Sequence, residues 1–353
     1  MTSSAHRRRK SRTTTLIVTG VAAAVAAGGA FAIGGSAMAT KAPQSAKAPG
    51  TTKATKAGAG FAPYVDTSLT PAYDLVDTAK KTGVKTFNLA FVTSGGGCDP
   101  KWGGSGELGN DPVAKQIPAL RKAGGDVRVS FGGANGSELG LACHSADELA
   151  AAYGKVIDQF HLTKADFDIE GGALPNTEAN TRRAQAIAQL QKKHPGLDVS
   201  FTLPVMPEGL TQDGVNLLAD AKKNGARISA VNIMAMDYGP SYSGDMGTYA
   251  TKAATATQGQ LKKALGLGDA AAWKTVAVTP MIGVNDVQNE VFKVDDATEL
   301  VKFAQDKHLA WLSMWSSTRD KPCPGGGNSA QPTCSSIDQA PLAFTKAFGA
   351  YTG

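Results

Sequence analysis

One short segment of the chain combines strong acidity with strong apolarity, and it decides the fold class: Ala165-Asp166-Phe167-Asp168-Ile169-Glu170-Gly171-Gly172. Side chains alternate between the two faces of an extended strand, so the three acids share one face while the two large apolar residues share the other. The apolar face suits packing against a layer of helices. In a closed barrel of strands, the acidic face would point into the interior.

The segment is one of eight short apolar or β-branched runs in residues 61–353, and the intervening stretches show helical periodicity. The runs are residues 61–65, 86–92, 127–133, 165–171, 198–205, 228–238, 276–284 and 309–316. Alternating strands and helices imply parallel strands with right-handed crossovers. Eight such units predict an α/β fold, the (β/α)8 or TIM barrel. An open doubly wound sheet is the alternative, but no glycine-rich phosphate-binding sequence follows the first run.

In a barrel of this kind, the chemistry belongs at the carboxyl ends of the strands. Burying three like charges together is costly, so we expect at least one of Asp166, Asp168 and Glu170 to stay protonated near neutral pH. Glu170 is nearest the strand end and is best placed to meet a substrate. A protonated acid beside a second carboxylate suits the cleavage of a glycosidic bond.

The acidic segment allows two other interpretations. Its D-x-D-x-x-G pattern also begins a calcium-binding loop, but Thr177 would occupy the twelfth position, where a bidentate Glu is required. A solvated acidic strand edge is the second alternative, and the apolar residues on the other face argue against it. The five histidines fall at no convincing strand end, which argues against a metal-dependent hydrolase. We therefore expect neither a metal nor a cofactor.

The acidic segment resembles the D-x-x-D-x-D-x-E signature of glycoside hydrolase family 18, the chitinase family, with Thr163 in place of its first acid. Three more segments resemble family motifs in their order and spacing. Ser130-Phe131-Gly132-Gly133 is similar to the S-x-G-G motif, and residues 232–238 are similar to the sixth-strand motif, with Met236 at the usual tyrosine position. Trp315 matches the tryptophan that forms the floor of the cleavage subsite.

The resemblance implies a retaining mechanism in which the substrate's own N-acetyl oxygen is the nucleophile. Glu170 would protonate the glycosidic oxygen and later activate water, Asp168 would bind the acetamide N–H, and Asp166 would hold Asp168 through a shared proton. Further substrate-binding residues implied by the resemblance are Asp237, Tyr238, Trp315, Ser130, Gly132 and Gly133. Candidates from their places at strand ends are Met281, Asp286 and Tyr64.

The predicted function is thus that of a secreted chitinase that cleaves β-1,4-linked N-acetylglucosamine polymers. One alternative is an endo-β-N-acetylglucosaminidase that acts on N-glycans with the same acids. Another is a non-catalytic chitin-binding lectin on the same barrel, although the presence of Glu170 argues against it. The expected partner is chitin or a chito-oligosaccharide, and we expect a monomer.

The first sixty residues hold nine basic residues and no acidic one, which leaves residues 61–353 with a formal charge of −3 out of the overall +6. A basic segment, an apolar stretch and the sequence Ala37-Met38-Ala39 predict a signal peptide over residues 1–39. Residues 40–60 are predicted to be a disordered Ala/Lys/Thr/Pro linker, and residues 61–353 the catalytic barrel. We expect an extracellular protein that does not bind nucleic acid and is not stably inserted in a membrane after cleavage. An uncleaved membrane anchor is the alternative.

The four cysteines of an exported chain most simply form two disulfides. Cys323 and Cys334 bracket a Pro/Gly/Asn-rich loop that a local bridge would close, and Cys98 and Cys143 remain as the other pair. Three pairings are possible in principle, and free buried thiols are a further alternative. A zinc site is disfavoured because no C-x-x-C or nearby histidine pair is present.

Overall fold

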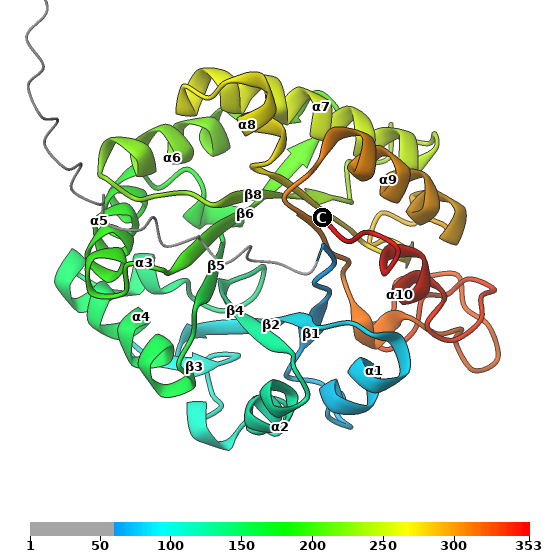
Figure 1. Ribbon diagram of the computed structural model, residues 1–353, viewed down its shortest axis with the longest axis horizontal. Helices are drawn as coiled ribbons and strands as arrows, with labels where there is room; N and C mark the ends of the chain where they lie inside the picture. The colour runs from blue at the N-terminus through cyan, green and yellow to red at the C-terminus, as the bar shows by residue number, and fades with distance from the viewer. Residues whose placement is uncertain (1–59) are drawn as a thin grey trace, which may run out of the picture. The chain divides into compact units, whose positions relative to one another are not determined.

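The computed structural model describes residues 60–353, and the predicted signal peptide and linker lie outside these residues except for Gly60. Eight parallel strands follow one another around the sheet in chain order (Figure 1). They are β1 (Tyr64–Asp66), β2 (Thr86–Ser94), β4 (Asp126–Gly132), β5 (Lys164–Asp168), β6 (Asp198–Met206), β8 (Ala230–Ala235), β9 (Val276–Pro280) and β12 (Trp311–Leu312). The amides of Ala62 and Tyr64 donate to the carbonyls of Leu312 and Met314 at 2.9 and 3.1 Å, which joins the first strand region to the last. The predicted barrel is confirmed.

Helices form a ring outside the strands (Figure 1). They are α1 (Leu75–Thr82), α2 (Ile117–Lys122), α3 (Leu139–Ala142), α4 (Ala146–Phe160), α5 (Thr177–Lys193), α6 (Gln212–Lys223), α7 (Met246–Leu265), α8 (Asp269–Trp273), α9 (Val294–Lys307) and α10 (Ala343–Phe348). Short accessory strands are β3 (Pro100–Trp102), β7 (Gly209–Leu210), β10 (Gly283–Val284) and β11 (Val291–Phe292). Within the described residues, no helix is both long and apolar enough to cross a bilayer.

Side-chain caps set where the long outer helices begin. Ser145 accepts from the amide of Glu148 at the start of α4, and Asn176 accepts from the amide of Ala179 at the start of α5. Asp245 caps α7 in the same way. Each cap satisfies an amide that has no partner inside the helix. Each cap therefore fixes the residue at which the preceding loop ends. These loops surround the site.

The layer between the sheet and the helices is aromatic around β5. Phe167 stacks on Phe131 at a ring distance of 5.4 Å and meets Tyr153 edge-on at 5.0 Å. Phe201, from β6, lies 5.8 Å from Phe167 on its other side. This packing holds the apolar face of β5 outward, as the alternation predicts, and leaves Asp166 and Asp168 on the inner face.

Three of the predicted runs extend beyond the strands that they contain. The sixth run, residues 228–238, forms a ladder only over Ala230–Ala235, and the seventh, residues 276–284, divides into β9 and β10. The eighth, residues 309–316, keeps only Trp311–Leu312 as regular strand. The regular ladder ends there, although single contacts continue: the amide of Trp315 donates to the carbonyl of Pro280 at 2.8 Å, and Met281 and Trp315 form an isolated parallel bridge.

Both predicted disulfides are confirmed. Cys98, in the loop between β2 and β3, is bonded to Cys143 at the end of α3. Cys323 is bonded to Cys334 and closes the loop before α10. The two bridges thus fix two separate loop regions on the carboxyl-terminal side of the strands.

Removing the longer-range bridge should destabilise the protein more than removing the local one. The bridges join residues 45 and 11 positions apart, and the chain-entropy model assigns about 4 and about 3 kcal/mol to loops of these sizes. Urea unfolding of Cys98→Ala/Cys143→Ala and of Cys323→Ala/Cys334→Ala should show this order. A larger loss in the second variant would contradict it.

Candidate active site

The carboxyl ends of the strands open into a cleft of about 730 Å³. Seven of the residues expected at the site line it: Tyr64, Asp168, Glu170, Asp237, Met281, Asp286 and Trp315. Five others are not among its lining residues: Asp166, Ser130, Gly132, Gly133 and Tyr238. These five residues lie below or behind the surface of the cleft.

Asp166 lies below the cleft, fully buried, and is surrounded by hydroxyl groups. It accepts hydrogen bonds from Tyr64 Oη at 2.8 Å and from Ser130 Oγ at 2.6 Å. Ser200 Oγ donates at 2.5 Å, and Thr202 Oγ1 lies 2.9 and 3.0 Å from the two carboxyl oxygens. A carboxylate offers only acceptors, so these donors satisfy it without a cation. Ser130 is expected to bind substrate. In the structure it donates to Asp166 instead, because its inward position on β4 places it beside that carboxylate.

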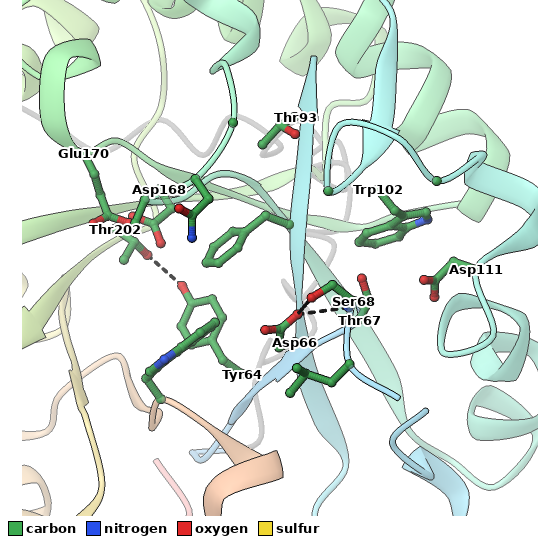
Figure 2. Close-up of a pocket in the computed structure, with 18 of the residues that line it drawn as sticks. Tyr64, Asp66, Thr67, Ser68, Thr93, Trp102, Asp111, Asp168, Glu170 and Thr202 are labelled. Atoms are coloured by element: carbon green, nitrogen blue, oxygen red, sulfur yellow. Dashed lines mark hydrogen bonds between the residues drawn. The ribbon is translucent and has the colours of Figure 1, made fainter. Parts of the chain in front are cut away.

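Asp168 and Glu170 form a coupled pair at the end of β5 (Figure 2). Burial, reinforced by the charges of Glu170 and Asp166, raises the pKa of Asp168 well above its usual value. Burial also raises the pKa of Glu170 to about 7, against a hydrogen bond with Asp168 that lowers it. Asp168 Oδ1 is buried without a hydrogen-bond partner. The pair therefore retains a proton near neutral pH, and one carboxyl oxygen is left for a ligand.

The two glycines of the Ser130–Gly133 motif are required by close approaches of the chain. Gly132 has φ +101°, and a Cβ there would overlap the carbonyl oxygen of Asp168. A Cβ on Gly133 would lie 2.8 Å from the ring of Phe91. The amide of Gly133 donates to the same carbonyl of Asp168 at 3.0 Å. These glycines thus hold the backbone of Asp168 rather than a sugar.

Three aromatic rings stand together beside the acids. Trp315 stacks with Phe91 at 5.6 Å, and Tyr64 lies 6.0 Å from Trp315 and 6.2 Å from Phe91. Phe91 was not predicted to be a site residue, because it belongs to an apolar strand whose sequence resembles that of a core strand. The pairing of β2 with β4 shifts register between Ala90 and Val92, and Phe91 lines the cleft. An irregular register of this kind has no signature in the sequence.

Tyr238, expected to bind the sugar, is not among the residues that line the cleft. Its side chain is 5% exposed and packs against Tyr242 and Tyr249, each at a ring distance of 5.8 Å. Strict alternation along the sixth run would place Met236 and Tyr238 inward and Asp237 outward. Asp237 has φ +51°, so the backbone turns after Met236 and brings both Met236 and Asp237 to the cleft.

Two buried charged residues that the sequence did not reveal hold the loops around Asp237 and Asp286. Glu290 accepts from the amides of Tyr238 and Gly239 at 3.0 and 2.7 Å. Arg319 donates to two carbonyls of the β10 region at 2.9 and 2.7 Å, and burial lowers its pKa to about 10. Neither residue ends a predicted strand, so the rule that places chemistry at strand ends could not find them.

Within residues 60–353, no set of three or more His, Cys, Asp or Glu side chains is arranged to hold a metal ion. The cleft offers instead two neighbouring carboxyl groups beside aromatic rings, the buried Asp168 and the half-buried Glu170 with a pKa of about 7. A closed βα-barrel with this arrangement at its strand ends has the features of a barrel glycoside hydrolase.

Comparisons with known proteins agree with this class. No family model matches the chain. It is 38% identical over 313 residues to the probable bifunctional chitinase/lysozyme of Escherichia coli (strain K12), which covers 83% of this chain and 34% of the relative. It is also 38% identical over 281 residues to Endochitinase 11 of Metarhizium anisopliae, covering 74% of this chain and 52% of the relative. The chain thus spans about a third to a half of the length of these curated relatives.

The crystal structure of the catalytic domain of a hyperthermophilic chitinase from Pyrococcus furiosus is 36% identical, with a TM-score of 0.75. The similarity covers 82% of this chain and 94% of that chain. The chain therefore belongs to the chitinases of glycoside hydrolase family 18.

Replacing Gly132 by alanine should destabilise the fold at the site. The added Cβ meets the carbonyl of Asp168, and the positive φ disfavours any residue with a Cβ, so we expect a loss of about 3 kcal/mol. Gly172→Ala is the control, since its Cβ would meet no atom within 4 Å. Urea unfolding of both variants tests this, and equal stabilities would contradict it.

The pH dependence of hydrolysis should change when the charge of Asp237 is removed. Glu170 must be protonated to act as an acid, so activity should fall as the pH rises through about 7. The charge of Asp237 raises the pKa of Glu170, so Asp237→Asn should move the alkaline limb of kcat/KM to lower pH. Asp213→Asn, on the exposed start of α6, should leave the limb in place. In Asp237→Asn, movement of the alkaline limb to higher pH would contradict the assignment of this limb to Glu170.

Proposed function

We propose that this chain hydrolyses β-1,4-linked N-acetylglucosamine polymers with retention of configuration, using the acetamide of the substrate as nucleophile. The observation that carries the proposal is the pair of neighbouring acids Asp168 and Glu170 at the end of β5, both with a pKa raised by burial. A group with a pKa of about 7 is protonated in half of the molecules at that pH, so it can both give and take a proton.

In the first step, Glu170 donates its proton to the glycosidic oxygen. The acetamide oxygen of the sugar attacks the anomeric carbon as the bond to the leaving oxygen breaks, and a cyclic oxazolinium ion forms. Asp168 Oδ1, buried and without a partner, accepts the acetamide N–H and so directs the acetamide oxygen. The negative charge of the carboxyl group stabilises the positive charge of the ring.

In the second step, the ionised Glu170 takes a proton from water, and the oxygen of that water attacks the anomeric carbon. The oxazolinium ring opens and restores the acetamide with the original configuration. Asp166 does not touch the substrate in this scheme. It lies below Asp168, is held by hydroxyl groups, and raises the pKa of Asp168 through its charge.

The residues that line the cleft are assigned to substrate binding. Trp315 and Phe91 offer ring faces to the sugar at the cleavage position, as aromatic side chains do in carbohydrate sites. Asp237 and Asp286 offer carboxylate acceptors for sugar hydroxyls, and Met281 contributes an apolar wall. Tyr64 shares its hydroxyl between Asp166 and Thr202, so we assign it mainly to holding Asp166.

The comparisons support chitin or its oligosaccharides as the substrate. The Pyrococcus furiosus enzyme, 35% identical here, is described in complexes of its catalytic-site mutants with chito-oligosaccharides. The curated relatives reported above are named as chitinases, so the N-glycan alternative is not favoured. The lectin alternative is not favoured either, because mere binding has no need of an acid with a raised pKa.

We also propose that the protein is exported and acts as a monomer. Two disulfides support an oxidising compartment. All residues named for the reaction lie in one chain, so a single copy is sufficient for activity. The predicted signal peptide would direct the export.

Glu170→Gln should reduce hydrolysis of an N-acetylglucosamine hexamer by about a thousandfold or more, because the amide cannot donate the proton. The amide keeps the shape of the side chain, so calorimetry should still detect binding of the hexamer. Hydrolysis that survives in the variant would falsify the assignment of Glu170. In the wild-type reaction, NMR should show the β-anomer as the first product, and an initial α-anomer would exclude the retaining scheme.

A further inference from the structure

The cleft continues well beyond the proposed catalytic pair. From Glu170 and Asp168 it passes Tyr64 and reaches Asp66, Trp102 and Asp111 at its far end (Figure 2). We call this far part the acidic arm and define it by the following lining residues: Asp66, Thr67, Ser68, Thr93, Trp102 and Asp111. It is built from the loops after β1 and β3 together with the end of β2.

The lining of the whole cleft is acidic and contains no Lys, Arg or His. Its acidic residues are Asp66, Glu107, Asp111, Asp168, Glu170, Asp237 and Asp286. The last four have places in the proposed reaction, and Glu107 is neutralised by Lys101 at 2.8 Å. Asp66 and Asp111 remain without an assigned role. Carboxylates can accept from the hydroxyls of a neutral sugar, as proposed for Asp237 and Asp286, but a sugar that carries a positive charge would also match the charge of Asp66 and Asp111.

Asp66 and Asp111 are held in place by hydrogen bonds from their own loops. Asp66 Oδ1 accepts from the amide and the hydroxyl of Ser68 at 2.9 and 2.6 Å (Figure 2). Asp111 is 9% exposed, and its Oδ1 accepts from the amides of Val113 and Ala114 at 2.9 and 2.7 Å. Among the described residues, neither carboxylate forms an ion pair, and Oδ2 of each has no hydrogen-bond partner. Asp111, the buried one of the two, thus lacks within this part of the chain the ion pair that a buried aspartate normally has.

A second feature of the arm points to a ligand independently of charge. Thr93 is 1% exposed and lines the arm, and its Oγ1 has no hydrogen-bond partner. A buried hydroxyl without a partner is uncommon in a folded protein. The arm therefore combines free carboxylate oxygens with a buried hydroxyl that lacks a hydrogen-bond partner among residues 60–353.

The chemistry that fits is a sugar unit that carries a protonated amine. Removing the acetyl group from N-acetylglucosamine leaves glucosamine, whose ammonium group supplies a positive charge and three N–H donors. At the cleavage position the acetamide must be kept, because it is the nucleophile. The arm lies away from the cleavage position, so a sugar bound there does not need an acetamide.

We propose that the acidic arm binds a glucosamine unit through Asp66 and Asp111, so that partially deacetylated chitin is preferred to fully acetylated chitin. The inference rests on the proposed chitinase activity and specifies the substrate class of the same cleft. The two carboxylates together should favour a suitably placed glucosamine by about three- to tenfold in kcat/KM, and salt should weaken the preference.

The test compares three hexamers: fully acetylated, with one glucosamine at the reducing end, and with one glucosamine at the other end. At low salt, we expect the wild-type protein to hydrolyse one of the two glucosamine hexamers about three to ten times more efficiently than the acetylated one. In 1 M NaCl the ratio should fall below about two, because the Debye length shrinks to about 3 Å.

The variants Asp66→Asn and Asp111→Asn remove the charge and keep the Oδ1 acceptor that holds each loop. Each should lower the ratio of kcat/KM between the glucosamine and acetylated hexamers, and the double variant should bring it close to one. Asp306→Asn, an exposed residue of α9 outside the cleft, removes the same charge and should keep the wild-type ratio.

The outcomes separate the two proposals. If the acetylated hexamer is hydrolysed as well as both glucosamine hexamers, the arm proposal is overturned and the chitinase assignment stands. A preference that persists in the double variant overturns the roles of Asp66 and Asp111. If the wild-type protein hydrolyses none of the hexamers, the proposed function itself fails.

Discussion

The burial of Asp166 and Asp168 on the inner face of β5, with Glu170 just beyond the end of the strand, is the constraint on which the site depends. A charge inside a protein is costly unless donors or opposite charges surround it. The barrel supplies these carboxyl groups with different numbers of hydrogen-bond donors. Asp166 receives hydroxyl donors from neighbouring strands, whereas Asp168 and Glu170 have few donors and keep a proton between them. The proton that the proposed acid catalysis requires would thus be a consequence of incomplete solvation at the end of the strand.

The backbone around β5 is shaped to maintain this arrangement. Gly132 and Gly133 let β4 come close enough for an amide to hold the carbonyl of Asp168. Glu290 and Arg319 hold the loops of Asp237 and Asp286 through backbone groups rather than through the catalytic carboxyls. Loop positions can therefore differ among related barrels while the acid pair keeps its surroundings. The acidic arm is a feature of such loops.

Regular alternation was a reliable guide inside the strands and failed at their ends. It placed Asp166 and Asp168 inward and Phe167 outward, as observed. It failed for Tyr238, since the left-handed backbone at Asp237 reverses the inward and outward positions. It also missed Phe91, because a local change of register brings an apparent core residue to the cleft. Both failures occur where hydrogen-bonded pairing is interrupted, so strand geometry no longer determines the direction of a side chain.

The sequence by itself determined the barrel, the acidic strand and the two disulfides, because these follow from local periodicity and from pairs of residues with few alternatives. Only the tertiary structure decided which acids have raised pKa values, which residues line the cleft, and that the cleft extends to Asp66 and Asp111. These properties depend on burial and on contacts between loops far apart in the chain. Solvation and distance in space are properties of the folded molecule, and spacing along the sequence does not encode them.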